Sequence, residues 1–261
     1  MDKASNTDNV FSMAAAPISL EAILQSARVV RGVQSVAEGA MSSSWPALDA
    51  ILPDRGLPRG VTELVAPRLT GGATTIALAV MRAAMLRDAR AWCAWIEVDG
   101  DARLYAPAVD RAGVDRARLF VVRAPSHASS HASSHASGRA SSHASGGARA
   151  LPRLASKVAA SGAFDVVVVR GASAFDVRAV RRLALATEEQ GGVVLLLTDT
   201  YVTHEAWPTA LRLELARAPE AISVRVARER RGRTSAARSV ALASRAEPDV
   251  RRPRAVLHAA G

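Results

Sequence analysis

Lysine is almost absent from this chain of 261 residues. Of its 34 basic residues only Lys3 and Lys157 are lysines, and the others are arginines. The single cysteine, Cys93, excludes a disulfide framework. Aromatic residues make up 4% of the chain, so the core must be built from alanine, valine and leucine. No apolar run approaches the ~18–20 residues of a membrane span, and residues 1–17 lack a signal-peptide pattern. We therefore expect a cytoplasmic protein with no membrane partner.

Positive charge is in excess, and it lies toward the C-terminus. The net charge is +10. Residues 1–124 are almost neutral, whereas residues 125–261 contain most of the excess arginine. No aromatic residue follows Trp207, so stacking on nucleobases is not expected in this region. Two interpretations remain open, an arginine-rich composition with an irregular tail and a strip that contacts DNA phosphates. The DNA-binding candidates of this strip are Arg225, Arg228, Arg230, Arg231 and Arg233.

Short apolar runs alternate with helical patterns along most of the chain. Continuous Val/Leu runs separated by helices predict an α/β fold with a mostly parallel sheet and flanking helices. Three strands in succession near the end predict an antiparallel C-terminal extension. The expected strands are 61–65, 92–98, 118–123, 164–169, 192–198, 209–216, 221–228 and 236–243. The expected helices are 18–31, a short turn at 45–52, 74–87, 104–112, 151–161 and 174–189.

A Ser/His-rich stretch at residues 124–147 interrupts this alternation and contains no aliphatic residue larger than alanine. Such a stretch buries too little apolar surface to offset its ordering entropy, so we predict a disordered insertion. It contains His127, His131, His135 and His143. The spacing of three of them would align metal ligands on a helix, but serine-rich sequence forms helices poorly and no carboxylate lies nearby. We therefore predict a linker and no metal site.

These patterns divide the chain into three predicted parts. Residues 1–44 form an N-terminal tail with an amphipathic helix, whose apolar face holds Leu20, Ile23, Leu24 and Ala27. Residues 45–243 form the core that contains the insertion. Residues 244–261 form a basic C-terminal tail.

The turn after the first core strand has the setting of a phosphate-binding loop, since a strand, glycines and a helix follow one another. That motif is Gly-x4-Gly-Lys-Ser/Thr, in which backbone N–H groups and the lysine bind phosphate. The lysine position falls on Gly72 or, one residue later, on Ala73, and Arg68 lies on the wrong part of the loop. The candidate loop, which we interpret as degenerate, consists of Ala66, Pro67, Arg68, Leu69, Thr70, Gly71, Gly72, Ala73 and Thr74.

The second half of a Mg-nucleotide site is also missing. An aspartate is required at the end of an apolar strand to orient the metal. Here the strand ends in Arg170, and Asp165 precedes it at the far end. Arg170 could instead pair with Glu97 or Asp99. With two elements absent, we expect no ATP or Mg²⁺ cofactor, no catalytic residue and no ATP hydrolysis. Cys93, in the middle of a strand, is expected in the core.

Several segments carry a family likeness. The run Trp-Pro-Ala-Leu-Asp-Ala-Ile-Leu-Pro-Asp-Arg-Gly-Leu-Pro-Arg-Gly-Val-Thr-Glu-Leu-Val-Ala-Pro from Trp45 resembles the approach to the phosphate loop in RecA recombinases. Segments 93–97, 112–125, 192–198 and 209–215 resemble later elements of that fold. The chain is most similar to the ImuA family, which is RecA-like and also related to the SulA cell-division inhibitors. The likeness to ImuA includes Leu-Asp-Ala-Ile-Leu-Pro, Leu-Arg-Leu-Glu-Leu and a closing arginine-rich strand pair.

This resemblance implies a RecA-like sheet and a role in bacterial SOS mutagenesis. The implied partners are an ImuB-like polymerase homologue and an error-prone C-family polymerase at the sliding clamp, with RecA and DNA as further candidates. Glu97, Asp99 and Asp101 follow the second strand, where related ATPases carry their water-activating acid. Without a bound triphosphate we interpret them as solvated acids.

The resulting hypothesis is a non-hydrolysing RecA-fold accessory protein for SOS repair and error-prone translesion synthesis. Two alternatives remain, a RecA-type DNA-dependent ATPase with a non-standard loop and a modulator that caps RecA filaments.

Overall fold

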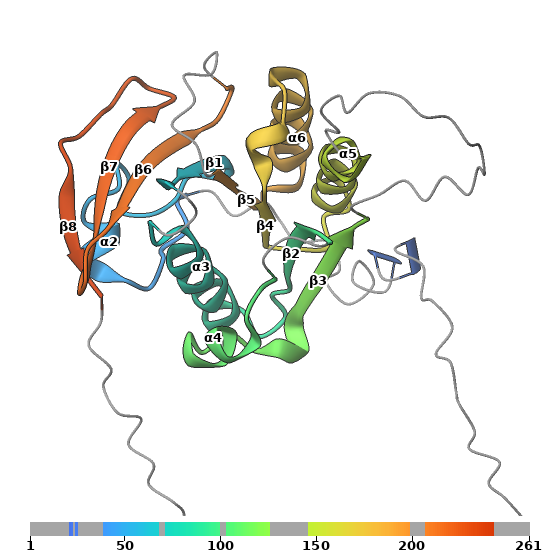
Figure 1. Cartoon of the computed structure of the whole chain (residues 1–261), viewed down its shortest axis with the longest axis horizontal. Helices are drawn as coiled ribbons and strands as arrows, with labels where there is room; N and C mark the ends of the chain where they lie inside the picture. The colour runs from blue at the N-terminus through green and yellow to red at the C-terminus, as the bar shows by residue number, and fades with distance from the viewer. Residues whose placement is uncertain are drawn as a thin grey trace, which may run out of the picture.

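Eight strands form one sheet in this protein, whose computed structural model describes residues 21–22, 24–25, 39–67, 71–99, 103–125, 146–198 and 207–242. The strand order is β3-β2-β4-β5-β1-β6-β7-β8 (Figure 1). The strands are β1 (Gly60–Val65), β2 (Cys93–Val98), β3 (Leu119–Ala124), β4 (Val166–Arg170), β5 (Val193–Thr198), β6 (Leu211–Arg217), β7 (Ala221–Glu229) and β8 (Arg238–Ala241). The first six strands pair in parallel, and β6–β7 and β7–β8 pair antiparallel. The predicted α/β class, with a mostly parallel sheet and an antiparallel extension, is confirmed.

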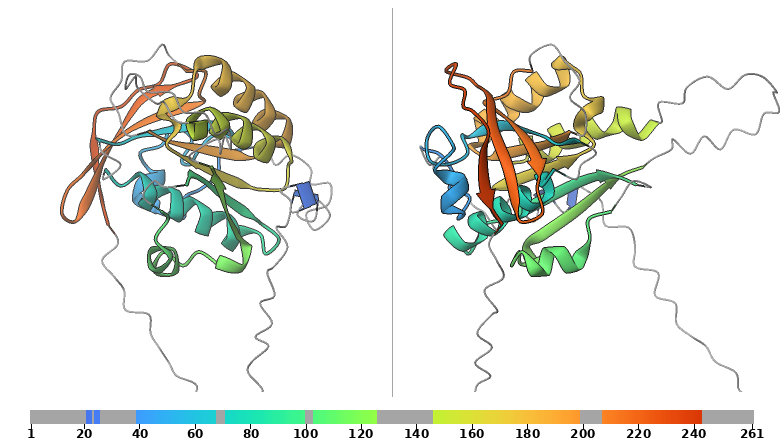
Figure 2. Two further views of the ribbon diagram at one scale, coloured as in Figure 1. Left: turned by 45° about the vertical axis from the view of Figure 1, so that its right-hand side comes forward. Right: turned by 60° about the vertical axis from the view of Figure 1, so that its left-hand side comes forward.

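Helices cover both faces of the parallel part, as both views in Figure 2 show. Alternate residues of one strand point to opposite faces, so Val168 of β4 packs on the side of α3, and Val167 and Val169 pack beneath α5 and α6. Because both faces are covered, the apolar runs of β4 and β5 and the whole of β1 are almost entirely buried. The helices are α2 (Pro46–Asp49), α3 (Ala73–Arg87), α4 (Ala106–Arg111), α5 (Gly146–Ala160) and α6 (Val177–Gln190).

Helix α6 has clear start and stop signals. The side chain of Asp176 accepts a hydrogen bond from the backbone N–H of Ala179 at 2.6 Å, which caps the first turn. Gly191 ends the helix with a φ of 65°, a left-handed conformation that glycine adopts without strain. Val180 and Leu183 are buried against the sheet, so the opposite side of α6 faces outward.

The structure places residues 39–44 of the predicted N-terminal tail, and residues 124, 146 and 147 of the predicted insertion, within the fold. Met41 exchanges two backbone hydrogen bonds of 2.7 Å with Leu57, so residues 39–44 pack on the core. Strand β3 continues through Ala124, and α5 begins at Gly146, which leaves residues 126–145 outside the described part. The C-terminal tail 244–261 also lies outside it. None of the described helices has the length and apolarity of a membrane span.

Candidate functional site

The candidate phosphate loop joins the centre of the sheet to α3. Strand β1 lies between β5 and β6, and the backbone N–H of Ala66 donates to the carbonyl of Thr198 at 3.0 Å. Arg68, Leu69 and Thr70 lie outside the described residues. At Gly71 an added Cβ would stand 2.7 Å from the Cβ of Ala66 and 2.9 Å from the carbonyl oxygen of Leu215. Glycine is therefore required here for close packing of the loop on the strands.

The start of α3 is packed against β7. Gly72 has a φ of 94°, and a Cβ at this position would stand 2.4 Å from Cδ1 of Ile222. Ile222 is fully buried, and Ala73, the first residue of α3, is 1% exposed. Thr74 is half-buried. Both positions that could hold the lysine are therefore surrounded by protein, and the two glycines serve close packing at this end of the helix.

The carboxyl end of β4 carries a cation at the position where a Mg-nucleotide site has an acid. Arg170 is the last residue of β4, is half-exposed and lies in register with Leu197 of β5. Asp165 lies at the opposite end, as the sequence predicts, and is 4% exposed. Its Oδ2 accepts a hydrogen bond from the backbone N–H of Trp92 at 3.2 Å, so Asp165 joins the amino ends of β4 and β2.

Glu97 differs from its interpretation as a solvated acid. It lies in β2 and is 1% exposed, and three donors surround its carboxylate. The indole Nε1 of Trp95 and the backbone N–H of Leu104 each donate to Oε2 at 3.0 Å, and Nε of Arg123 donates to Oε1 at 3.2 Å. These hydrogen bonds offset the cost of burying the charge. Three strand spacings, about 14 Å, separate β2 from β1, so Glu97 does not face the loop.

The other acids near β2 are differently placed. Asp99 is half exposed and pairs with Arg103 at 3.4 Å. Asp101 lies outside the described residues. The pairing of Glu97 or Asp99 with Arg170 that the sequence suggested is therefore replaced by nearer arginines, Arg123 and Arg103.

Cys93 is confirmed as a core residue. It is fully buried, and its Sγ lies 3.8 Å from the carbonyl oxygen of Met81. Burial raises the pKa of its thiol far above the ordinary value, because the thiolate would lose its hydration. Cys93 is thus not suited to be a nucleophile.

The end of the β7–β8 hairpin is fastened to the turn after α2. Arg233 donates to both carboxylate oxygens of Asp54 at 2.9 and 3.0 Å, and its Nε donates to Glu229 at 3.2 Å. Arg231 lies 3.7 Å from Asp54. The hydrogen bonds from Arg233 hold the pKa values of Asp54 and Glu229 below their ordinary range.

Two further candidates of the arginine strip also have partners in the fold. Arg225 donates through Nε to Glu214 of β6 at 2.8 Å. Arg228 donates to the carbonyl of Trp207 and, at 3.0 Å, to Oγ1 of Thr209. Arg230 is exposed on the hairpin. The charges of Arg225, Arg231 and Arg233 are therefore paired with carboxylates within the protein, and one of these, Asp54, is distant in sequence.

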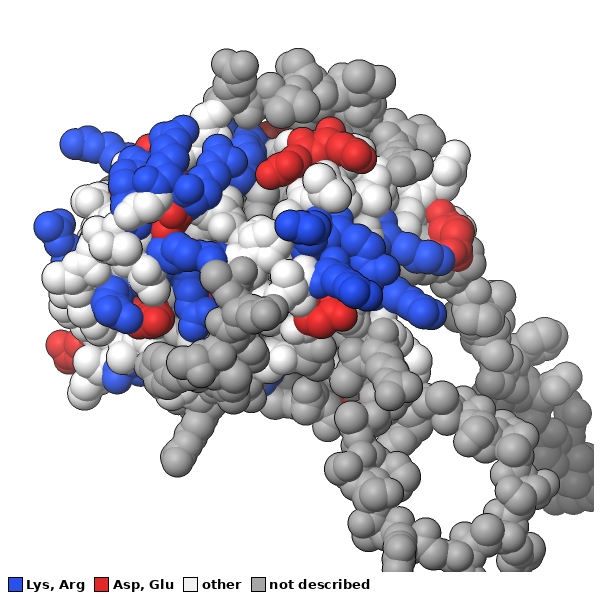
Figure 3. All heavy atoms as spheres, turned by 90° about the horizontal axis from the view of Figure 1, so that it is seen from above, with Lys and Arg blue, Asp and Glu red and all other residues white. Residues whose placement is uncertain are grey.

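Sequence reasoning did not single out a second group of arginines, on α6. Figure 3 shows basic side chains gathered over α5 and α6, apart from those over β6 and β7. Arg178, Arg181 and Arg182 are exposed and, with Asp176 and Leu185, line a shallow groove of about 450 Å³. Their spacing of three and four residues on a predicted helix was the signal that could have revealed them.

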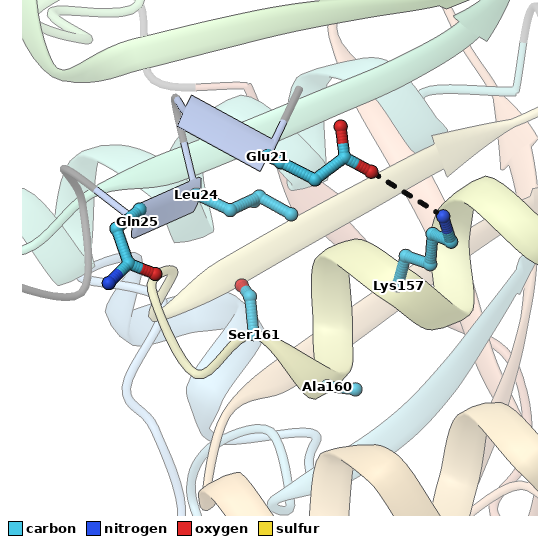
Figure 4. A pocket seen from close by; sticks show the side chains of 6 residues that line it. All are labelled: Glu21, Leu24, Gln25, Lys157, Ala160 and Ser161. Carbon is cyan, nitrogen blue, oxygen red and sulfur yellow. Dashed lines mark ion pairs between the residues drawn. The ribbon is translucent and has the colours of Figure 1, made fainter. Parts of the chain in front are cut away.

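The N-terminal segment touches α5, as Figure 4 shows. Glu21 pairs with Lys157 at 3.6 Å, and Leu24 packs against the core on the α5 side. Leu24 belongs to the predicted apolar helix face, whereas Leu20, Ile23 and Ala27 lie outside the described residues. A hollow of about 360 Å³ between the two segments is lined by Glu21, Leu24, Gln25, Lys157, Ala160 and Ser161.

Within the described residues, no three His, Cys, Asp or Glu side chains are grouped as metal ligands would be. The four histidines of the predicted linker lie outside that part of the chain. No protein-family model matches the chain, and no curated protein is significantly similar to it.

Proposed function

We propose that this chain is a non-hydrolysing RecA-fold accessory protein of SOS-type repair and error-prone translesion synthesis. Its partners would be an ImuB-like polymerase homologue and an error-prone C-family polymerase, and DNA would be a further ligand. A parallel sheet with flanking helices and an antiparallel extension is the architecture that the RecA resemblance implies, which supports the proposal.

The packing of Ile222 against Gly72 is the observation that carries the non-hydrolysing part. A phosphate loop needs a lysine beside the helix start to balance the charge of the outer phosphates. Gly72 has no room for a side chain, and Ala73 is buried in the core. At the carboxyl end of β4, the guanidinium of Arg170 would repel Mg²⁺ where an aspartate would bind it.

Nucleotide binding and turnover test this part. We expect the purified full chain to show no Mg²⁺-dependent ATP hydrolysis, with or without single-stranded DNA. The variant Asp99→Asn removes the charge of the exposed acid after β2. Its control is Asp110→Asn, because Asp110 on α4 is equally exposed and is also paired with an arginine, Arg116. Turnover that is lost in Asp99→Asn and kept in Asp110→Asn would refute the proposal in favour of a DNA-dependent ATPase.

Binding to purified partners tests the accessory role. We expect the tagged chain to retain the ImuB-like protein or the C-family polymerase in buffer without nucleotide. The accessory role would be contradicted if the chain retained neither partner, or if it retained a partner only when ATP was present.

DNA contact by the arginine strip is tested separately by salt titration. If Arg230 contacts a phosphate, Arg230→Ala should reduce the slope of log affinity against log salt by about one unit. Arg233→Ala does not serve here, because Arg233 holds the fold together through Asp54 and Glu229.

A further inference from the structure

The outward face of α6 has an ordered distribution of charge. Successive residues of a helix are 100° apart, so the exposed residues of α6 other than Gln190 in the last turn fall within an arc of about 120° opposite the buried ones. Along the length of the helix, the basic residues of this arc come first, a leucine lies in the middle and the acidic residues come last. We call it the α6 face, and it consists of Arg178, Arg181, Arg182, Leu185, Glu188 and Glu189.

This charge order is unfavourable for the isolated helix. Cations near a helix N-terminus and anions near its C-terminus both oppose the helix dipole. Arg178 also lies three and four residues before Arg181 and Arg182, a spacing at which like charges repel. Among the described residues, no ion pair involves the charged side chains of the α6 face. Apart from the capping carboxylate of Asp176, which lines the same groove as the arginines, the described part of the fold gives these charges no compensation.

Leu185 is 56% exposed and lies at the centre of symmetry of the α6 face. Arg181 and Arg182 precede it by four and three residues, and Glu188 and Glu189 follow it by three and four. At 1.5 Å per residue, the two arginines and the two glutamates lie about 4.5 to 6 Å on either side of Leu185. The face is thus complementary in charge to itself when a second helix runs in the opposite direction.

We propose that the α6 face binds the α6 face of a second copy of this chain, with the two helices antiparallel about a two-fold axis near Leu185. Each copy's Arg181 and Arg182 then lie opposite Glu188 and Glu189 of the other copy, and the two Leu185 side chains meet at the axis. A two-fold interface requires this kind of self-complementary patch. Arg178 faces the C-terminal end of the second helix, where the dipole is negative.

A nucleic acid fits this face less well than a second copy does. Phosphates would be attracted to the arginines but repelled by Glu188 and Glu189 on the same arc. The helix has 14 residues and is about 21 Å long, so one helix pair buries less than the roughly 1,200 Å² of a standard stable interface. The dimer is therefore weak, in the micromolar range, and weakens as salt is added.

Sedimentation of the full chain at about 100 µM in low salt tests the dimer. We expect a concentration-dependent species at twice the 27.3 kDa monomer mass, which dissociates in high salt. Two double variants reverse one half of the face each, Arg181→Glu with Arg182→Glu, and Glu188→Arg with Glu189→Arg. Each should raise the dimer Kd about tenfold or more, because attractive pairs become repulsive.

Mixing the two double variants is the decisive measurement. The acidic variant complements the basic one at every position of the α6 face, so the mixture should form a heterodimer that neither variant forms alone. Misfolded variants could not form this heterodimer. Both double variants also place charges that agree with the helix dipole, so their monomers should unfold at or above the wild-type temperature.

A control pair on the opposite side of the sheet changes the same amount of charge, Arg87→Glu with Arg90→Glu at the end of α3. It should dimerise like the wild type. A wild type that stays monomeric, variants that still dimerise, or a mixture that does not recover the dimer would each overturn the proposal. Loss of single-stranded DNA binding in the acidic variant of a monomeric protein would assign the face to nucleic acid instead.

Discussion

The free energy of unfolding of a Gly72 variant tests whether the start of α3 has room for a side chain. Replacing it with alanine adds a Cβ to a residue with a φ of 94°, which costs about 1–2 kcal/mol because of the left-handed backbone. The same Cβ would stand 2.4 Å from Cδ1 of buried Ile222, and overpacking of this kind costs about 1–3 kcal/mol. We therefore expect Gly72→Ala to lower the free energy of unfolding by about 2–5 kcal/mol.

Gly232 provides a matched control. Its φ is 82°, but a Cβ there meets nothing within 4 Å. Gly232→Ala therefore carries the backbone cost without the collision, and the difference between the two variants measures the contact with Ile222. Urea unfolding followed by circular dichroism gives both free energies. A Gly72→Ala variant that loses no more stability than Gly232→Ala would refute the packing argument.

A double-mutant cycle identifies the neighbour. Ile222→Ala removes Cδ1, Cγ1 and Cγ2, which would stand 2.4, 2.8 and 3.2 Å from a Cβ at residue 72, and by itself costs about 2–5 kcal/mol. In combination with Gly72→Ala it also relieves the collision, so the double variant should lose about 1 kcal/mol less than the sum of the single variants. In the Gly232→Ala background the two losses should add. Additivity in both backgrounds would show that Ile222 does not limit space at Gly72.

Three further predictions concern buried or paired groups. Because Arg233 lowers the pKa values of Asp54 and Glu229, its stabilising effect is present above about pH 4 and is lost as the pH falls through those lowered values. Arg233→Gln should thus destabilise the protein at neutral pH and differ less from the wild type near pH 2 to 3, and an unchanged difference across a pH series of unfolding curves would contradict this. Glu97→Ala leaves the indole of Trp95 and a backbone N–H without their acceptor and should cost about 2–4 kcal/mol in urea unfolding, whereas a neutral result would mean that water replaces the carboxylate. Cys93 should react with a thiol reagent only after unfolding, because it is fully buried, and rapid labelling of the native protein would disprove its place in the core.

The elements of the sheet were predictable because their signals are local. Fully buried parallel strands are continuous apolar runs, and Val166–Val169 and Val193–Leu197 read as such without any knowledge of their neighbours. The position of Arg170 at the carboxyl end of β4 follows from the same run. The absence of a lysine from the candidate phosphate loop was also predictable, because Lys3 and Lys157 are the only lysines of the chain.

The environment of each candidate residue was not predictable in the same way. Glu97 was interpreted as solvated, since a carboxylate after a strand is usually exposed and its donors Leu104 and Arg123 come from other elements. For the strip around Arg233 the sequence left open both a DNA-binding surface and a composition effect, because its main partner Asp54 lies 179 residues earlier.

Composition and periodicity thus determined by themselves that this is an α/β protein whose glycine-containing turn after β1 lacks the lysine that a phosphate loop requires. Only the tertiary structure decided that Ile222 packs against Gly72 and that Asp54 pairs with Arg231 and Arg233. It also decided that the charges of the α6 face point outward and form no ion pair within the described residues. The physical reason is that strand and helix patterns depend on neighbours within a few residues. Charge pairing and close packing depend on which distant segments the sheet order brings together.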